Sequence, residues 1–176
     1  MPLTAGNVRV AVSGEVSVGP VATAAPTDAT TALNAAFKGL GYISEDGITQ
    51  ENERDIEDIP AWQNAAVVRS RVTSAKESFT FTLIETNVDT IEFVYGTSVT
   101  QTVDDGAYEI VPGGTVGNQS FVIDVIDGSV LKRIYIEEGE LSERGETVYA
   151  SGEPIGYECT VVAYTNPQVW DTSLAT

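Results

Sequence analysis

The chain has 176 residues, of which 26 are Asp or Glu, 9 are Lys or Arg and none is His, so its formal net charge at pH 7 is −17. Without histidine, neither a Ser-His-Asp or Cys-His nucleophile nor a His-bearing zinc site can form. A domain this acidic also repels the phosphate backbone, which disfavours adhesive binding of nucleic acid. Catalysis, if there were any, would rest on carboxylates alone.

The composition predicts one folded domain over residues 1–176. Hydrophobic residues make up 42% of the chain and charged residues 20%, which is ordinary globular usage. Cys159 is the only cysteine, so no internal disulfide is expected. The first residues do not resemble a secretory leader, and no apolar run approaches the ~20 residues that cross a bilayer. We expect folding in a reducing, soluble compartment, with no cofactor and no membrane partner.

Period-two alternation begins near the N-terminus, where Val8, Val10 and Val12 predict a half-buried strand. Residues 19–31 are rich in Pro, Ala and Thr and match no packed element. A helical spacing follows: Leu33, Ala36, Phe37 and Leu40 fall at i, i+3, i+4 and i+7, with Lys38 in the last turn and Gly41 as a stop. This spacing predicts a short amphipathic helix over 33–40.

Acidic residues alternate over the next segment. Glu51, Glu53, Asp55 and Glu57 are spaced two apart, so in an extended strand their carboxylates project from one face. Like charges on one face are tolerated where water or cations screen them. The stripe is either a solvated edge that guards against aggregation or a specific negatively charged surface that also includes Asp58. A calcium site is a minor alternative, because the EF-hand loop pattern is absent.

The second half of the chain reads as strands around one helix. Val88, Ile91 and Tyr95 predict a helix between Asn87 and Gly96. Alternation also predicts strands. The residues that share one face of each strand are Phe79, Phe81 and Leu83 in the first; Phe121, Ile123 and Val125 in the second; Val130, Lys132, Ile134 and Ile136 in the third; and Tyr157, Cys159, Val161 and Ala163 in the fourth.

Turn signals favour antiparallel pairing. Asp46-Gly47, Asp105-Gly106 and Asp127-Gly128 are dipeptides typical of tight hairpins. We therefore expect a mainly β protein, an antiparallel β-sandwich or partly closed barrel with one or two short flanking α-helices. Long irregular segments remain at 111–119 and 166–176, and such loops are usually functional or flexible.

No pattern predicts a catalytic or metal site. A second acidic cluster, Glu137, Glu138, Glu140, Glu143 and Glu146, reads more simply as solvated loop charge. A glycosidase needs only two carboxylates, but with 26 acids almost any chain offers a pair. The Gly-rich run at 112–117 lacks the ending of a phosphate loop, and Cys159 on a strand is better explained as a buried structural thiol.

Several of these residues resemble a known family. The segments Phe37-Lys38-Gly39-Leu40, Glu53 to Gln63 and Phe79 to Asn87, together with the predicted helix ending at Tyr95-Gly96, are similar to the major tail (tail tube) proteins of bacteriophages with long non-contractile tails, especially those of actinobacterial hosts. The resemblance is continuous from about residue 33 to 96. Beyond it, the C-terminal half shares only a β-rich character that ends in Tyr164-Thr165-Asn166-Pro167.

The resemblance implies a structural virion protein rather than an enzyme. Its subunits would form stacked hexameric rings, a hollow tail tube through which DNA passes without sticking to acidic walls. The implied partners are further copies of the chain and the tape measure, tail terminator and tail tip proteins, after assembly in the host cytoplasm. The implied assembly arms are residues 1–7, 19–31 and 166–176; the single residues to which we assign this role are Val8, Pro20, Pro26, Trp62 and Pro167.

Two other functions stay open at this point. A β-sandwich that binds carbohydrate or decorates a capsid fits the same elements, although Trp62 and Trp170 are far apart in sequence and form no evident aromatic platform. An acid-pair hydrolase is a third possibility. Tube subunit is the leading hypothesis because hairpin-rich strands, long arms and a charge of −17 occur here without catalytic side chains.

Overall fold

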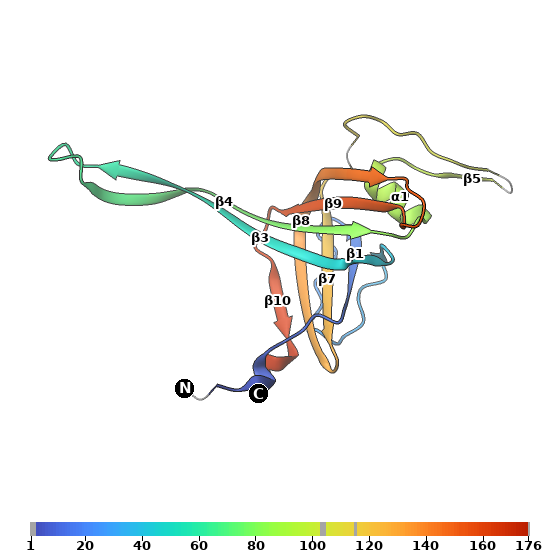
Figure 1. Cartoon of the computed structure of the whole chain (residues 1–176), viewed down its shortest axis with the longest axis horizontal. Coiled ribbons are helices and arrows are strands. Elements are labelled where there is room, and N and C mark those ends of the chain that lie inside the picture. Colours follow the sequence, from blue (N-terminus) through green and yellow to red (C-terminus); the bar gives the residue numbers. More distant parts are fainter. Residues whose placement is uncertain (1–2, 103–104, 115, 176) are drawn as a thin grey trace.

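The computed structural model describes residues 3–102, 105–114 and 116–175, and they form one antiparallel sheet, a small hairpin and one α-helix (Figure 1). The sheet has the strand order β2-β1-β7-β8-β9-β4-β3, with β10 paired to β8. Its strands are β1 (Ser13–Pro20), β2 (Lys38–Gly39), β3 (Ile43–Pro60), β4 (Val67–Leu83), β7 (Gln119–Asp127), β8 (Val130–Val148), β9 (Gly156–Ala163) and β10 (Gln168–Asp171). The separate hairpin consists of β5 (Thr100–Thr102) and β6 (Asp105–Ala107). The predicted mainly β, antiparallel fold is confirmed.

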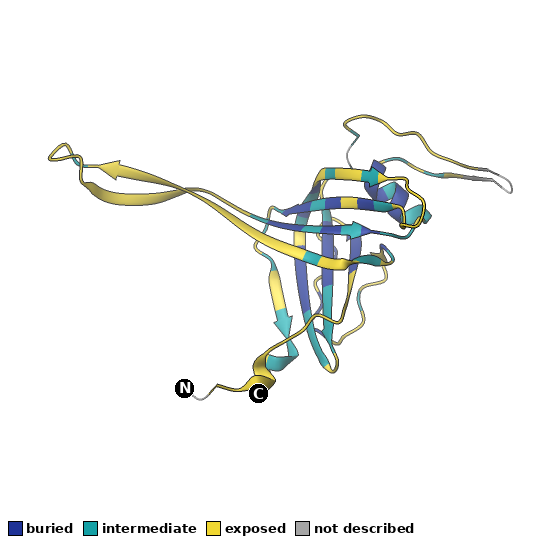
Figure 2. Ribbon diagram, in the orientation of Figure 1, coloured by how far each residue is buried: buried dark blue, intermediate teal, exposed yellow. Residues whose placement is uncertain are grey.

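Strand β8 holds the two halves of the sheet together. From Val130 to Gly139 it pairs with β7, between Lys132 and Tyr135 it also pairs with β10, and from Gly139 onward it pairs with β9. In Figure 1, β7 and the first half of β8 cross β3, β4 and β9 steeply, so the sheet turns over on itself without closing into a barrel. The core lies inside this turn (Figure 2) and includes Phe79, Phe81, Leu83, Phe121, Ile123, Ile136, Tyr157, Cys159 and Val161. These are apolar faces that the alternation predicts.

Helix α1 (Val88–Tyr95) packs on this core where the sequence predicts a helix. The Asn87 side chain accepts a hydrogen bond from the Thr90 amide at 2.8 Å, which satisfies one free donor of the first turn. Gly96 has a φ of 62° and its N–H donates to the carbonyl of Glu92, a left-handed C-terminal cap. One face of the helix, including Ile91 and Phe93, is buried.

The predicted helix over 33–40 is wrong. Asn34 instead forms a turn in which its side chain accepts from the Ala36 amide at 3.0 Å, a local bond that competes with helix formation. Lys38–Gly39 then forms strand β2 against β1, and the Leu40 amide donates to Val16. Leu40 is fully buried, so the apolar spacing is satisfied by a turn and a short strand.

The predicted strand at Val8, Val10 and Val12 is also wrong, because its partner ends too early. β1 begins at Ser13, which lies opposite Ile126. β7 ends one residue later, where the chain turns into β8, so residues before Ser13 have no ladder to extend. The three valines are 72%, 63% and 73% exposed.

Of the three predicted tight turns, Asp127-Gly128 lies at one: Gly128 and Ser129 connect β7 to β8, and Gly128 has a φ of 59°. Asp46-Gly47 instead lies within β3, at a register shift between Ile43 and Ile48. Asp105-Gly106 lies in β6, and the connection at 103–104 is outside the described residues. A dipeptide that supplies positive φ thus serves a bulge as well as a hairpin.

The segments predicted to be irregular are partly ordered by the sheet. Arg133 is buried and forms a bidentate pair with Asp124, at 2.7 and 2.8 Å. Its other nitrogen donates to the carbonyls of Asp28 and Thr31, so the 19–31 segment is fixed to β8. The 166–176 segment was expected to be irregular, but it contains β10 and the 3-10 helix η2 (Thr172–Leu174).

Gly139 sits where β8 passes from one half of the sheet to the other. A Cβ at this position would lie 2.8 Å from the carbonyl oxygen of Val162 and 3.3 Å from side-chain atoms of Ile136 and Phe121. We predict that Gly139→Ala lowers the free energy of unfolding by about 2 kcal/mol, as overpacking does. Urea denaturation measures this. Gly106→Ala is the matched control, because no atom lies within 4 Å of its Cβ; equal effects of the two variants would contradict the prediction.

Candidate functional site: a projecting arm and an acidic sheet face

The β3–β4 hairpin continues far beyond the sheet (Figure 1). β4 pairs with β9 only from Glu77 to Leu83. Beyond that point, residues 49–76 are exposed on both faces except Ala61 (Figure 2); we call them the arm. Trp62 at its tip is 98% exposed. A two-stranded ribbon is at best marginally stable in water, so the arm lacks the packing that stabilises the rest of the chain.

The arm carries a β-bulge that decides which side chains share a face. Asp55 lies opposite Ser74, but the next residue, Ile56, lies opposite Val72, which leaves Thr73 as the extra residue. Directly opposed residues of an antiparallel pair point to the same face. The extra residue therefore exchanges the two faces of β4 from this point to Arg69. A second register shift leaves Val68 as an extra residue and places Val67 opposite Pro60.

Because of this exchange, the arm is amphipathic. On one face, the charged face, the acidic residues of β3 oppose basic and polar residues of β4: Glu51, Glu53, Asp55, Glu57, Arg69, Arg71, Ser74 and Lys76, with Ile59 opposite Arg69. On the other, the apolar face, most of the aliphatic residues meet: Ile56, Pro60, Val67, Val72 and Ala75, with Asp58 and Ser70 between them and Arg54 opposite Ala75.

The cations of the charged face offset its carboxylates. Arg71 reaches Glu57 at 2.7 Å and Lys76 reaches Glu53 at 4.0 Å. Both pairs are exposed, so each stabilises the arm little. Over residues 49–76 there are 5 acidic and 4 basic residues, a net charge of 5 − 4 = 1 negative unit. The rest of the chain carries −17 − (−1) = −16, so the arm is nearly neutral.

The base of the stripe belongs to a wider acidic surface. Glu51 and Glu53 line a shallow groove of about 280 Å³ together with Glu143 of β8 and Glu158 of β9, around the cation Lys76. The floor of the groove is the face of β4 and β9 turned away from the core, where Thr80 and Thr160 share a hydrogen bond of 3.0 Å. We call this surface the acidic face.

The predicted acidic residues therefore lie in three places. Glu51 and Glu53 lie on the acidic face, Asp55 and Glu57 lie farther out on the arm, and Asp58 lies on the apolar face, where it accepts a hydrogen bond from Ser70. The stripe alone does not indicate Glu158. The alternation of Glu158 with Tyr157 and Cys159 predicts only that it faces away from the core. The pairing of β9 with β4 places it in the same groove as Glu51.

The residues proposed as assembly arms lie apart from one another. Trp62 is at the tip of the arm and Val8 lies in the exposed N-terminal segment. Pro20 ends β1, and Pro26 is buried in the segment that Arg133 holds. Pro167 immediately precedes β10.

Two other features are absent from the described residues. No cluster of three or more His, Cys, Asp or Glu side chains in that part of the chain is arranged to hold a metal ion. Within the same residues, no helix has the length and apolar character needed to span a membrane.

A small β-sheet body with a long, exposed, amphipathic arm is suited to a class of protein that makes contacts with other protein chains. Comparison with protein families identifies the class more closely: residues 1–173 match the model of the family described as "Phage tail tube protein". The chain belongs to the phage tail tube protein family, a family of structural proteins of the virion tail.

Comparison with solved structures gave matches to chains of two large assemblies, among others. A chain from the virion of a native gene transfer agent particle is 9% identical, with a TM-score of 0.43, over 78% of this chain and 91% of that one. A chain from the sheath-tube complex of an extracellular contractile injection system, in its extended state, is 8% identical, with a TM-score of 0.46, over 94% and 93% of the two chains. No curated protein sequence matches this chain.

Proposed function

We propose that this chain is the subunit of a hollow tail tube, in which copies join through their arms into hexameric rings that stack and deliver phage DNA to the host. The observation that carries the proposal is the amphipathic arm: its apolar face and Trp62 are exposed, with no partner in the part of the chain that the structure describes. Membership of the tail tube family supports the same assembly. A head-to-tail contact of this kind closes into a ring or propagates as a tube.

The charge distribution supports assembly through the arm. Two bodies of charge −16 repel each other, whereas the nearly neutral arm approaches a neighbour at little electrostatic cost. Contact through the arm also holds the acidic bodies apart by much of its length. Twelve residues of β3, from Thr49 to Pro60, extend about 40 Å at ~3.3 Å per residue.

The acidic face is the surface we assign to the bore. Six copies would give a ring a formal charge of about −100 before counterions condense. Carboxylates at Glu51, Glu143 and Glu158 would repel the phosphates of passing DNA, and the repulsion acts within a Debye length of about 8 Å at physiological ionic strength. DNA that fits the bore closely would then slide without adhering.

The remaining parts of the proposal follow from a tail tube. The partners are other copies of the chain and, at the ends and inside of the tube, the terminator, tip and tape measure proteins. Assembly would take place in the host cytoplasm and the product would reside in the virion. The alternative, a carbohydrate-binding or capsid-decorating module, has weaker support: Trp62 and Trp170 lie on different elements, the arm tip and β10.

Electron microscopy of concentrated protein or purified particles tests the proposal. We expect stacked rings that contain this chain, and a reconstruction that places Glu143 and Glu158 on the bore wall. Tubes with these carboxylates on the outer wall would contradict the role of the acidic face but leave the tube subunit intact. Particles whose tails lack the chain would contradict the proposed function itself.

Ionic strength should control assembly. Raising salt from 0.15 to 1 M shortens the Debye length from about 8 to about 3 Å and screens the repulsion between the bodies. We therefore predict that the concentration of protein needed for polymerisation, measured by sedimentation, falls as salt rises. Tubes that dissolve in high salt would instead show that ion pairs between copies dominate the contact.

The bulge in the arm provides a second prediction. Inserting one serine between Asp55 and Ile56 would give Thr73 a partner and restore a regular register, so that Ile56 and Val72 move to the charged face and Glu57 and Arg71 to the apolar face. We expect the variant to keep the unfolding free energy of the wild-type monomer within about 0.5 kcal/mol, because the arm contributes nothing to the core, and to lose polymerisation.

Thr73→Ser is the matched control for this insertion, because it changes the same site and keeps the unpaired extra residue. Light scattering measures polymerisation and urea denaturation measures stability for both variants. Normal tubes from the insertion variant would show that the apolar face is not part of the contact.

A further inference from the structure

We infer that the arm tip of one copy docks in a groove at the C-terminal end of a second copy, with Trp62 seated in the groove and Asp58 paired with Lys132. This inference rests on the proposed self-assembly and names the surface that receives the arm. The groove has a volume of about 510 Å³ and lies between β10, the 3-10 helix η2 and the segment fixed by Arg133. We call it the C-terminal groove.

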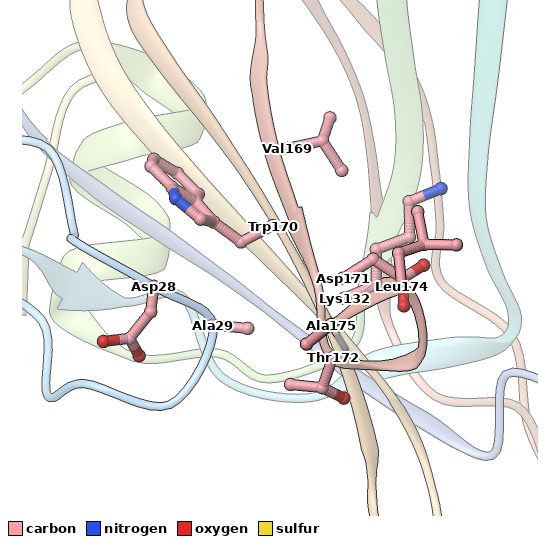
Figure 3. A pocket seen from close by; sticks show the side chains of 9 residues that line it. All are labelled: Asp28, Ala29, Lys132, Val169, Trp170, Asp171, Thr172, Leu174 and Ala175. Atoms are coloured by element: carbon pink, nitrogen blue, oxygen red, sulfur yellow. The ribbon is translucent and has the colours of Figure 1, made fainter.

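The groove has an apolar lining that the described residues leave open. Ala29, Val169, Trp170 and Leu174 line it, from three separate parts of the chain, and Figure 3 shows Trp170 pointing toward Ala29 and Val169 pointing to the other side of β10. Val169 is 51% exposed and Leu174 79% exposed. The volume of the groove lies in the ordinary range of binding pockets, about 300–1,000 Å³. Tryptophan is among the side chains most often found as buried anchors at interfaces.

The tip of the arm matches this lining. The segment from Ala61 to Val68 carries no charged residue, and Trp62, Val67 and Val68 are 98%, 56% and 65% exposed. The groove on the acidic face is a poor receptor by comparison, because four glutamates line it around a single lysine. Burial of an indole there would remove water from carboxylates without pairing them.

The C-terminal groove contains one cation that can bind a carboxylate of a partner. Lys132 lies opposite Asp171 in the ladder, and its ammonium lies within 4.0 Å of no carboxylate in the described part of the chain. The two carboxylates that line the groove accept hydrogen bonds near them in sequence: Asp171 from Ser173, and Asp28 from the residues that follow it. Lys132 forms no salt bridge among the described residues, so its ammonium can donate to a further carboxylate.

Asp58 supplies the matching charge. It lies on the apolar face of the arm, between Ile56 and Pro60, and is the acidic residue nearest to the uncharged tip. Its hydrogen bond with Ser70 is exposed, so its carboxylate can also accept from a lysine. An arm seated by Trp62 would thus bring Asp58 to the rim of the groove.

The contact must join two copies. Figure 1 shows the arm running away from the body, while β10 and the C-terminus lie on another side of it. An arm of about 40 Å that leaves the sheet in this direction does not return to its own groove. Each copy therefore offers one arm and one groove, which makes the contact heterologous and able to continue from copy to copy.

Disulfide trapping tests the contact. Trp62→Cys and Val169→Cys are made separately, and Gln63→Cys is a second arm-tip position in case the loss of the indole prevents docking. The native Cys159 is fully buried, and burial raises the pKa of its thiol to about 12, so it does not compete. Mixed under assembly conditions and oxidised, an arm-tip variant and the groove variant should give a covalent dimer as the main product.

Tyr42→Cys is the matched control for the groove, because Tyr42 is 77% exposed and is not part of the C-terminal groove. An arm tip that links to position 42, or to neither position, would overturn the inference. If tubes form normally but the linkage does not, the inference is wrong and the proposed function still holds. If the wild-type protein forms no tubes, the proposed function itself is contradicted.

Charge reversal tests the ion pair. Asp58→Lys and Lys132→Asp should each raise the protein concentration needed for assembly by about tenfold, since each places like charges together, and the double reversal should restore assembly. Additive loss in the double variant would exclude the pair.

A competing occupant is the N-terminal segment of a neighbour, where Leu3 is fully exposed. Deletion of residues 1–7 should leave the trapped dimer unchanged. Loss of the dimer on that deletion, with Trp62→Ala assembling normally, would assign the groove to the N-terminal segment.

Discussion

A ribbon of two paired strands has two faces, and in the arm no other element among the described residues covers either of them. This constraint explains how apolar and charged residues are placed in the molecule. In the body of the sheet, one face of each strand finds the core, and α1 covers part of it. In the arm both faces meet water, so whatever apolar surface the arm displays must be covered from outside its own chain. One extra residue, Thr73, places Val72 opposite Ile56 on the apolar face and Arg71 opposite Glu57 on the charged face. Without the bulge, aliphatic and basic residues would mix on both faces.

Charge is distributed to suit the same constraint. A net charge of −17 keeps separate copies apart, yet five of the acids lie on the arm beside four of the nine basic residues. The acidic bodies of other copies therefore repel the arm much less than they repel the rest of the chain. The acidic character concentrates where strands β3, β4, β8 and β9 turn a polar face to solvent. Solubility of the monomer and contact between copies are thus assigned to different parts of one sheet.

The sequence predicts what local spacing determines. The strands around Phe79 and Tyr157 were found because one face of each is buried, and α1 was found because Asn87 and Gly96 cap it. The failures have nonlocal causes. Val8 to Val12 alternate as a strand should, but β7 ends before it can pair with them.

The site was predictable in the same limited way. The spacing of Glu51 to Glu57 reveals a charged face on β3, because that strand is regular there. The apolar face was hidden, because it depends on a register shift that neither strand's sequence displays by itself. The C-terminal groove combines residues near positions 29, 132 and 170, and only the folded chain brings these together. Leu33 to Leu40 shows the converse: a helical spacing is overridden by one side chain, Asn34, that bonds to its own backbone.

Strand β8 has a mechanical consequence for a tube. It carries Lys132 at the C-terminal groove and Glu143 at the acidic face, and it connects through β9 to β4, which continues into the arm. Tension applied to an arm would therefore pass to the groove of the same copy through consecutive hydrogen-bonded ladders. Strands pulled along their length share the force among many hydrogen bonds at once, whereas strands peeled from one end break them singly. A tail assembled in this way would stretch and bend through the contacts between its copies before its subunits unfold.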